Sequence, residues 1–359
     1  MKQQAGVALI TAILIVALAT IAATSVASRQ FMDIRRATNV FNNEQLYLYA
    51  MAVEAVAMEG LRVYTEKVKY DRIFSPETAN EGGTHEFPFE WTFEDTESAV
   101  SAKVYDQETK FNVNNLVVQK EKDGNVQWLA DTKQKDRFIR ILNKVIADLQ
   151  SEADALQLVD ALVDWLDPDS QISGNFGAED AEYSSLELPY STANGLLASA
   201  SELILVQGFT KELLYGKVDD SDQEQPVAIP GLLQYMTALP DNSTTINPNT
   251  ADPVVLAALS DIVNEEMINT VIADRITRPF KDVATFTDAL KDQFTGDDKA
   301  EKQGKIAEDF TGLDVQSSYF LAQSTATVGK NSLMLNSLLY RNTTGSNFVI
   351  ARAIGTHGI

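Results

Sequence analysis

The pattern of apolar and polar positions is dominated by the first sixty residues. Between Gly6 and Gly60 lie 53 residues without glycine or proline, the residues that break helices. Residues 7–27 carry no charge and are numerous enough to cross a bilayer as a helix. Residues 29–59 place apolar side chains at helical spacing with polar ones between them. The pattern predicts one rod of about 80 Å that leaves a membrane and enters a folded domain.

The period then changes from helical to strand-like. Aromatic residues alternate with smaller or polar ones over 85–93, which predicts a strand with one buried face. Pro88 within it indicates an edge position. A shorter alternation over 100–104 predicts a second strand. A small antiparallel sheet covered by the amphipathic half of the long helix is the architecture that these elements favour.

A long helical region separates these strands from a second group of strands. From about residue 127 to 310 the period is mostly helical, with one of the predicted helices at 194–206, which predicts a compact all-α region in two sub-bundles. Strand patterns return at 318–328, 332–340 and 347–354. The sequence therefore predicts an α+β fold in which an all-α domain is inserted, and in which the last strands complete the sheet begun at 85–105.

The first six residues, MKQQAG, admit three interpretations. A secretory signal would be cleaved before Ser28, although the apolar run exceeds the usual 7–15 residues. A plain uncleaved anchor is the second. The third, which we favour, is a leader similar to that of type IV pilins. The resemblance implies that a prepilin peptidase cuts after Gly6 and leaves Val7, with a methylated amine, as the mature start. Most pilins carry Glu at the fifth mature position, where this chain has Thr11.

Composition narrows the functional classes. The net charge of −22 argues against nucleic acid, because phosphate contacts need clustered Lys and Arg. The absence of cysteine excludes disulfides and thiolate metal sites. With two histidines, no HExxH and no glycine-rich phosphate loop, the chain carries no enzymatic motif, and adjacent carboxylates arise by chance among 51 acidic residues. We therefore expect a protein that is not an enzyme.

Two acidic stretches are candidates for Ca²⁺, which takes six to eight oxygen ligands. The richer one is DWLDPD at 164–169, followed by GAEDAEY at 177–183. It lacks the spacing of an EF-hand, and a solvated loop with aspartates capping helices is the alternative. The second, 219–224, is more weakly suggestive, and a solvated loop is favoured there.

Several motifs occur in an order that resembles one known family. They are the leader and rod with GVALIT at 6–11, SRQ at 28–30, DIRR at 33–36, KFNVNNL at 110–116, DWLDPD at 164–169 and INPNTA at 246–251. Together they are similar to the minor pseudopilin K (GspK) family of type II secretion. Thr11 agrees with the resemblance, because that family departs from other pilins at this position.

The resemblance implies a pilin-like fold, in which a long N-terminal α-helix lies on a small antiparallel sheet, with a large SAM-like all-α domain inserted between strands. The domains would be a prepilin leader at 1–6, a transmembrane segment at 7–27 and a pilin-like domain built from 28–105 and 311–359. The inserted α-domain would be 106–310, with sub-bundles at about 106–215 and 216–310.

The resemblance also implies bound calcium in the inserted domain. The ligands that it suggests are Asp167, Asp169, Glu179 and Asp180, with Asp222 and Glu224 as weaker candidates. The implied role is at the tip of the pseudopilus, where the protein would cap and help initiate assembly with minor pseudopilins I and J. Such a protein would be a single-pass protein of the bacterial inner membrane with its folded domains in the periplasm, acting in the export of folded proteins.

Two other functions remain open from the sequence. The chain would alternatively be a membrane-anchored periplasmic module that binds secreted substrates through its acidic domain. A minor pilin of a type IV pilus is a near neighbour of the main interpretation. Genomic neighbours with pilin-like leaders would favour an assembly role over a binding role.

Overall fold

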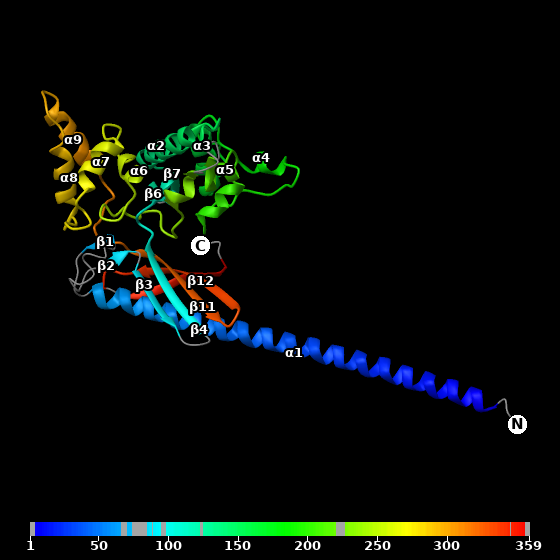
Figure 1. Cartoon of the computed structure of the whole chain (residues 1–359). Coiled ribbons are helices and arrows are strands. Elements are labelled where there is room, and N and C mark those ends of the chain that lie inside the picture. The colour runs from blue at the N-terminus through cyan, green and yellow to red at the C-terminus, as the bar shows by residue number, and fades with distance from the viewer. Residues whose placement is uncertain are drawn as a thin grey trace.

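The computed structural model describes residues 4–65, 70–73, 85–87, 89–94, 98–122, 125–219, 227–344 and 346–355. The N-terminal part of the chain is a single long helix, α1 (Gln4–Thr65). Its N-terminal half projects far beyond the folded body (Figure 1). Every residue from 9 to 41 whose side chain is described is exposed. The predicted continuous rod is confirmed, and it is amphipathic only where the body begins.

The central sheet joins strands from both ends of the chain. Its order is β13-β12-β11-β4-β3, and every neighbouring pair is antiparallel. The strands are β3 (Phe89–Glu94), β4 (Ser98–Asp106), β11 (Tyr319–Val328), β12 (Asn331–Arg341) and β13 (Asn347–Ile354). The prediction that the C-terminal strands complete the sheet is confirmed, because β11 pairs with β4 along its whole length.

The C-terminal half of α1 covers one face of this sheet. Leu46 and Ala50 pack near one end of the strands, against Ala326 and Leu335. Further along α1, the apolar residues reach the opposite end of the same strands; this second cluster contains Val53, Ala57, Leu61, Val104, Phe320 and Leu339. Burial of these side chains supplies the main force that holds the helix to the sheet.

An ion pair between a buried glutamate and an exposed arginine adds specificity to this helix–sheet packing. Glu54 of α1 is 3% exposed, and both its carboxylate oxygens accept from the Arg352 guanidinium of β13 at 2.7 and 2.8 Å. Ser337 of β12 also donates to this carboxylate. Burial raises the pKa of Glu54, but the bonds from Arg352 and Ser337 outweigh it, so the net pKa is lowered.

The first predicted strand is divided in two. β2 (His85–Phe87) pairs in parallel with β1 (Asp71–Ile73), outside the main sheet, whereas β3 begins at Phe89 and pairs with β4. Residue 88 lies outside the described part of the chain. The single strand expected at 85–93 was wrong because a proline offers no N–H to continue a ladder.

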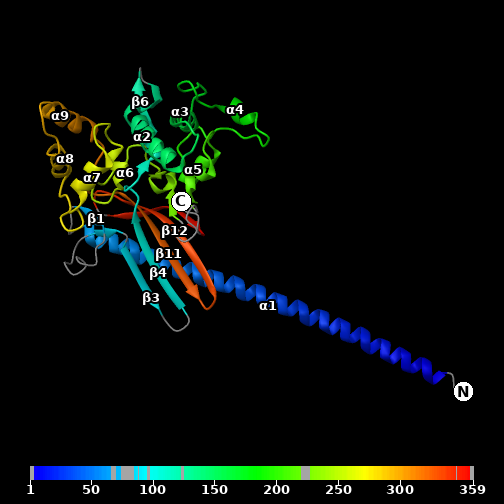
Figure 2. The ribbon, with the colours of Figure 1, turned by 45° about the horizontal axis from the view of Figure 1, so that its top comes forward.

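The polypeptide between β4 and β11 forms the insert, a separate body above the sheet (Figures 1 and 2). Its α-helices are α2 (Thr132–Leu149), α3 (Ala155–Leu166), α4 (Asp180–Ser184), α5 (Lys211–Tyr215), α6 (Pro253–Ala257), α7 (Glu265–Ile272), α8 (Val283–Lys291) and α9 (Lys299–Asp309). Its 3₁₀ turns are η1 (Val113–Leu116), η2 (Ala200–Leu205) and η3 (Leu232–Gln234). Its buried apolar side chains form one continuous core from Phe111 to Val315.

The expectation of an all-α insert needs a correction. Antiparallel hairpins are formed by β6 (Val117–Lys122) with β7 (Asn125–Ala130) and by β8 (Gly216–Asp219) with β9 (Val227–Pro230). β5 (Phe111–Asn112) and β10 (Met236–Thr237) pair in parallel. The Asp123-Gly124 dipeptide between β6 and β7 is a hairpin signal in the sequence. The helix expected at 194–206 is only the turn η2, because Asn194 adopts a left-handed φ of 46° that no α-helix contains.

Buried charges lie where the insert meets the sheet. Asp71 and Arg341, 1% and 4% exposed at their side chains, form an ion pair, with Arg341 Nη1 at 3.2 Å from Asp71 Oδ1. Arg341 Nε donates to the Ser317 carbonyl at 3.1 Å. Asp106, at the end of β4, accepts from Ser317 Oγ at 2.6 Å and Thr250 Oγ1 at 2.7 Å. This junction therefore ties both connections of the insert to the end of the sheet.

Two of the junction carboxyl groups have pKa values above their ordinary ones. Burial raises the pKa of Asp106 to about 6, and the negative charge of Asp71 contributes. Burial and the charge of Asp106 raise the pKa of Glu108 to about 8. Glu108 Oε1 accepts from the Ser318 amide at 2.9 Å, and Oε2 accepts from Thr245 Oγ1 at 2.9 Å. These two hydrogen bonds favour the charged carboxylate, but burial and the charge of Asp106 outweigh them.

We expect Arg341→Met to lower the free energy of unfolding by about 3–5 kcal/mol, because it leaves the buried Asp71 carboxylate without its counter-charge. Urea denaturation of the full chain in detergent, followed by tryptophan fluorescence, measures the change. Arg62→Met is the matched control, since Arg62 pairs with Glu59 at 2.6 Å on an exposed part of α1 and should cost under about 1 kcal/mol. Equal costs for the two variants would contradict the assigned role of Arg341.

We expect Glu108→Gln to flatten the pH dependence of stability between pH 5 and pH 8. The wild-type Glu108 retains its proton in the folded state up to a pKa of about 8, whereas the unfolded group ionises near its ordinary value of 4.5. The contribution of this group is therefore fully present below pH 4.5 and is lost as pH rises toward 8, by up to about 1.4 kcal/mol per pH unit. Urea midpoints at pH 5, 6.5 and 8 measure the difference. The exposed Glu301→Gln should leave the wild-type profile unchanged.

Candidate metal centre

One face of α3 presents a row of aspartates. Asp160, Asp164 and Asp167 lie at i, i+4 and i+7, so they follow one another along the same side of the helix. The helix starts at the N-cap Asp154, whose carboxylate accepts from the Leu156 amide at 2.8 Å. Its other side is buried in the core of the insert, which fixes the rotation of α3 and directs the aspartate row toward the following loop.

That loop folds back over the aspartate row. Asp164 Oδ1 accepts from the Ser173 amide at 2.8 Å, and Asp160 Oδ2 accepts from the Asn175 amide at 3.2 Å. Two glycines allow this close approach. A Cβ at Gly177 would lie 2.1 Å from Asp164 Oδ2, and Gly174 has a φ of +62°. The loop is thus held by carboxylates of α3 and its course requires residues without a side chain.

Aromatic packing brings the far end of the loop to the end of α3. The Trp165 and Tyr183 rings meet edge to face with centroids 5.2 Å apart, and Tyr190 lies against both. Because Tyr183 belongs to α4, this cluster holds the first residues of α4 beside the last residues of α3. Tyr183 Oη also accepts from the Gln207 amide at 3.1 Å.

The result is a group of three carboxylates. Asp167 is the C-cap of α3, Glu179 is the N-cap of α4, and Asp169 lies in the loop between them. One oxygen from each residue lies within 4.8 Å of the others. Asp167 and Glu179 are each only 6% exposed, whereas Asp169 is exposed and gives the group an opening to solvent.

The electrostatics of this group favour either a cation or bound protons. Burial, with the charges of Asp169 and Asp164, raises the pKa of Asp167 to about 7. Burial, with the charges of Asp164 and Asp167, raises the pKa of Glu179 to about 7. Asp167 Oδ1, Glu179 Oε1 and Asp164 Oδ2 are buried and have no hydrogen-bond partner among the described residues. Buried oxygens of this kind are costly unless something neutralises them.

A hard divalent cation fits these donors. All three are carboxylates and one is open to water, which provides the oxygen ligands that Ca²⁺ takes. Mg²⁺ demands a stricter octahedron and keeps several waters, so a loop with buried carboxylates suits it less well. The arrangement can bind a cation and thereby fasten α4 to α3.

The other predicted site residues lie elsewhere. Asp180 is not in the group, because its Oδ1 accepts from the Thr192 amide at 2.8 Å and from Thr192 Oγ1 at 2.9 Å. These bonds lower its pKa. Asp222 and Glu224 lie outside the described residues. Gly6 and Val7 lie in the first turns of α1, and Thr11 is on the exposed surface of that helix.

Sequence reasoning missed the residues that shape the loop. Asp160 and Asp164 were not assigned roles, although their i, i+4 spacing with Asp167 at i+7 places them on one side of α3. Gly174 and Gly177 follow within a short distance and are what a loop needs to pass close to such a row. The pairing of each aspartate with a particular loop amide could not be read from the sequence.

Family comparisons agree with this architecture. The family described as type II secretion system (T2SS), protein K matches the chain twice, over residues 109–216 and 246–304. The first match contains the three-carboxylate group, and both lie in the insert. The long helix and the sheet fall outside these two matches.

Individual relatives extend the likeness to the whole chain. The type II secretion system protein K of Aeromonas hydrophila is 28% identical over 365 residues, covering 99% of this chain and 98% of the relative. That of Pseudomonas aeruginosa is 29% identical over 373 residues, covering 100% of this chain and 95% of the relative.

A solved structure shares the fold. It is described as the crystal structure of the GspK-GspI-GspJ complex from the enterotoxigenic Escherichia coli type 2 secretion system. One chain of it matches with a TM-score of 0.66 and 22% identity, covering 89% of this chain and 99% of that one. Two matches to one family, relatives aligned along nearly the full length and a common fold lead to one conclusion: the chain is similar along nearly its whole length to the type II secretion system protein K family, which is a family of pseudopilins and not a known enzyme family.

Proposed function

We propose that this protein is a membrane-anchored minor pseudopilin that occupies the tip of the type II secretion pseudopilus, where it caps the filament and helps initiate assembly. The observation that carries the proposal is the position of the insert. The insert joins the sheet at Asp106 and Tyr319. These residues lie at the end of the sheet against which Leu61 of α1 packs. The exposed half of α1 leaves the body from the other end of the sheet (Figure 1).

The exposed half of α1 supports a membrane anchor. Within the described residues, α1 is the one helix long and apolar enough to span a bilayer, and its most apolar window has a mean hydropathy of 2.4 with none of it buried. Contiguous apolar surface of this extent needs lipid or neighbouring helices to cover it. We place this segment in the bacterial inner membrane, with the sheet and the insert in the periplasm.

The insert supports a terminal position. In a filament whose subunits all point their N-terminal helices toward the membrane, the next subunit outward would stand over the membrane-distal end of this one. The insert occupies that end as a body wider than the sheet (Figures 1 and 2). A subunit of this shape fits best where no further subunit follows it.

Thr11 agrees with the same position. In pilin filaments a carboxylate at the fifth mature position of one subunit is thought to neutralise the N-terminal amine of the subunit above. If this chain begins at Val7 after processing by a prepilin peptidase, its fifth residue is Thr11, which carries no charge. A topmost subunit has no amine above it to neutralise, so the absence of a carboxylate costs it nothing.

Minor pseudopilins I and J are the partners that we propose. The structural relative was solved as a GspK-GspI-GspJ complex, and its fold is shared along nearly its whole length. The exposed surface of α1 between the apolar run and the sheet includes Phe31, Ile34, Val40 and Phe41. Helices of neighbouring pilin-like subunits would cover these side chains.

We further propose that Asp167, Asp169 and Glu179 bind Ca²⁺. Buried carboxylate oxygens without partners and mutual repulsion among the three groups support this assignment. The ion would supply positive charge that joins the end of α3 to the start of α4. Asp160 and Asp164 would hold the loop in its course through their bonds to Asn175 and Ser173. The role of calcium is therefore structural.

A substitution at Thr11 tests the tip position. We expect Thr11→Glu to be processed to a Val7 start but incorporated into pseudopili roughly 70- to 400-fold less, since a carboxylate without a partner in the membrane costs about 2.5–3.5 kcal/mol. Thr11→Gln, which has the same shape and no charge, should assemble like wild type. Intact mass measures processing, and the amount of protein in sheared pseudopili measures incorporation. Normal incorporation of Thr11→Glu would indicate an amine above it and would contradict the topmost position.

Calcium addition tests the metal proposal. Saturating Ca²⁺, at about 100 times the dissociation constant, should stabilise the full chain by about 2.7 kcal/mol and raise its midpoint of thermal unfolding by roughly 5–10 °C. Asp167→Asn and Glu179→Gln should abolish the shift. The nearby exposed Glu187→Gln should retain it. Calorimetric titration with CaCl₂ against EGTA-treated protein gives the binding constant, and the absence of heat and of a midpoint shift would refute the site.

A further inference from the structure

Three arginines follow the apolar run of α1 directly. They are Arg29, Arg35 and Arg36, and Asp33 is the one carboxylate between the start of the chain and Glu44. The remainder of the chain is strongly acidic, since the whole protein carries −22. A short basic segment thus separates the apolar part of the helix from an acidic body. The side chains of the three arginines and of Asp33 are all exposed, so the folded domain does not cover this segment.

The position along α1 corresponds to the depth of lipid headgroups. Residues 9–28 span about 30 Å as a helix, which is the thickness of a bilayer's hydrocarbon core. Arg29 would then lie at the boundary, and Arg36 about 10 Å beyond it. The headgroup layer is roughly 5–8 Å thick on each side. Helical side chains tilt toward the N-terminus, so arginines just outside the membrane reach back toward it.

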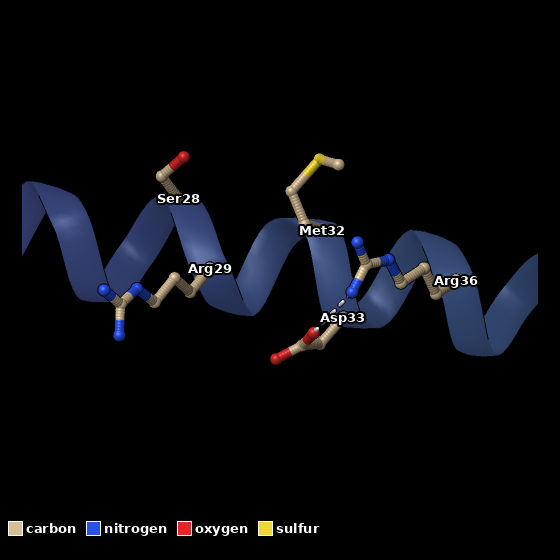
Figure 3. Close-up of a pocket in the computed structure, with 5 residues that line it drawn as sticks. All are labelled: Ser28, Arg29, Met32, Asp33 and Arg36. Atoms are coloured by element: carbon tan, nitrogen blue, oxygen red, sulfur yellow. Dashed lines mark ion pairs between the residues drawn. The ribbon is translucent and has the colours of Figure 1, made fainter.

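The side chains have the expected direction. Figure 3 shows the guanidinium groups of Arg29 and Arg36 both displaced toward the N-terminal end of the helix from their points of attachment. Together with Ser28, Met32 and Asp33 they line a shallow hollow on α1. Arg36 Nη1 lies 4.0 Å from Asp33 Oδ1, and both side chains are about three-quarters exposed, at 76% and 74%. Such a pair contributes little, so the guanidinium remains able to bind another anion.

We propose that Arg29, Arg35 and Arg36 form a binding site for the phosphate groups of anionic phospholipids, in the leaflet that faces the folded domain. Guanidinium groups bind phosphate oxygens through paired, charge-assisted hydrogen bonds. The Ser28 hydroxyl, at the boundary of the hydrocarbon core, would donate to a headgroup. The site sets the depth of α1 and resists its sliding into or out of the bilayer. The inference rests on the membrane anchoring proposed above.

Lipid selectivity of the isolated protein tests the site. The full chain, purified without partner subunits, is reconstituted into phosphatidylcholine vesicles that contain spin-labelled phosphatidylglycerol or spin-labelled phosphatidylcholine. Electron spin resonance of the motionally restricted lipid gives the relative association constant of the two lipids at the protein boundary. Flotation of the vesicles measures anchoring separately.

We expect the wild type to prefer phosphatidylglycerol at least roughly fivefold at low salt, as the contact of a single arginine with an anionic headgroup would produce. In 1 M NaCl, where the Debye length is about 3 Å, the ratio of the two association constants should fall toward unity. Arg29→Gln/Arg35→Gln/Arg36→Gln should abolish it, and Asp33→Asn should increase it by removing the competing carboxylate. Arg62→Gln is the matched control, because Arg62 belongs to the same helix but pairs with Glu59 beside the folded body.

The outcomes separate the two proposals. Failure of the wild type to float with vesicles would refute anchoring itself. Flotation without a preference for phosphatidylglycerol, or a preference that the triple variant retains, would overturn the lipid site. If the triple variant floats, shows the wild-type lipid profile and loses assembly with partner subunits, the arginines serve a protein contact instead.

Discussion

The pairing of β4 with β11 is the interaction on which the rest of the molecule depends. It joins Ser98–Asp106 to Tyr319–Val328 across the whole intervening insert, and it places Asp106 opposite Phe320. Both ends of the insert are therefore fixed at one end of the sheet. The apolar face that this pairing completes, which includes Val104 and Phe320, is the surface on which α1 packs. Without it neither the helix nor the insert would have a defined place.

The same pairing explains the buried charges at the junction. Asp71, Arg341 and Asp106 lie where the last residues of β4 and the first residues after the insert converge, so their side chains share one partner. The Ser317 amide donates to the Asp71 carboxylate, its hydroxyl donates to Asp106, and its carbonyl accepts from the Arg341 guanidinium. An apolar junction would bury more area, but polar contacts with fixed geometry specify how the insert is joined to the sheet. Burial at this junction, where Glu108 is 2% exposed, raises the pKa of that carboxyl group to about 8.

Function follows from how these parts are arranged along α1. The end of the helix that would enter the membrane is bare, its middle carries a basic segment, and its last turns hold a sheet that bears the insert at the far end. A long helix with a distal body of this kind suits a subunit that ends a filament. The three-carboxylate group lies in the insert, between α3 and α4, so the proposed calcium would act on the part of the protein that is most remote from the membrane.

The sequence by itself determined the elements whose signals are local. A run without glycine or proline predicted α1, and alternation predicted β11, β12 and β13 within one residue at each end. The family resemblance suggested Asp167, Asp169 and Glu179, together with Asp180, and the first three lie together in the structure. Tertiary structure decided the rest, because hydrogen-bond partners far apart in the chain leave no periodic trace. It separated Asp180 from the carboxylate group through Thr192, and it gave Asp160 and Asp164 the task of holding the loop. The periodicity of apolar residues in the sequence shows which side of a helix or strand is buried, whereas only the folded structure shows which residues pack against that side.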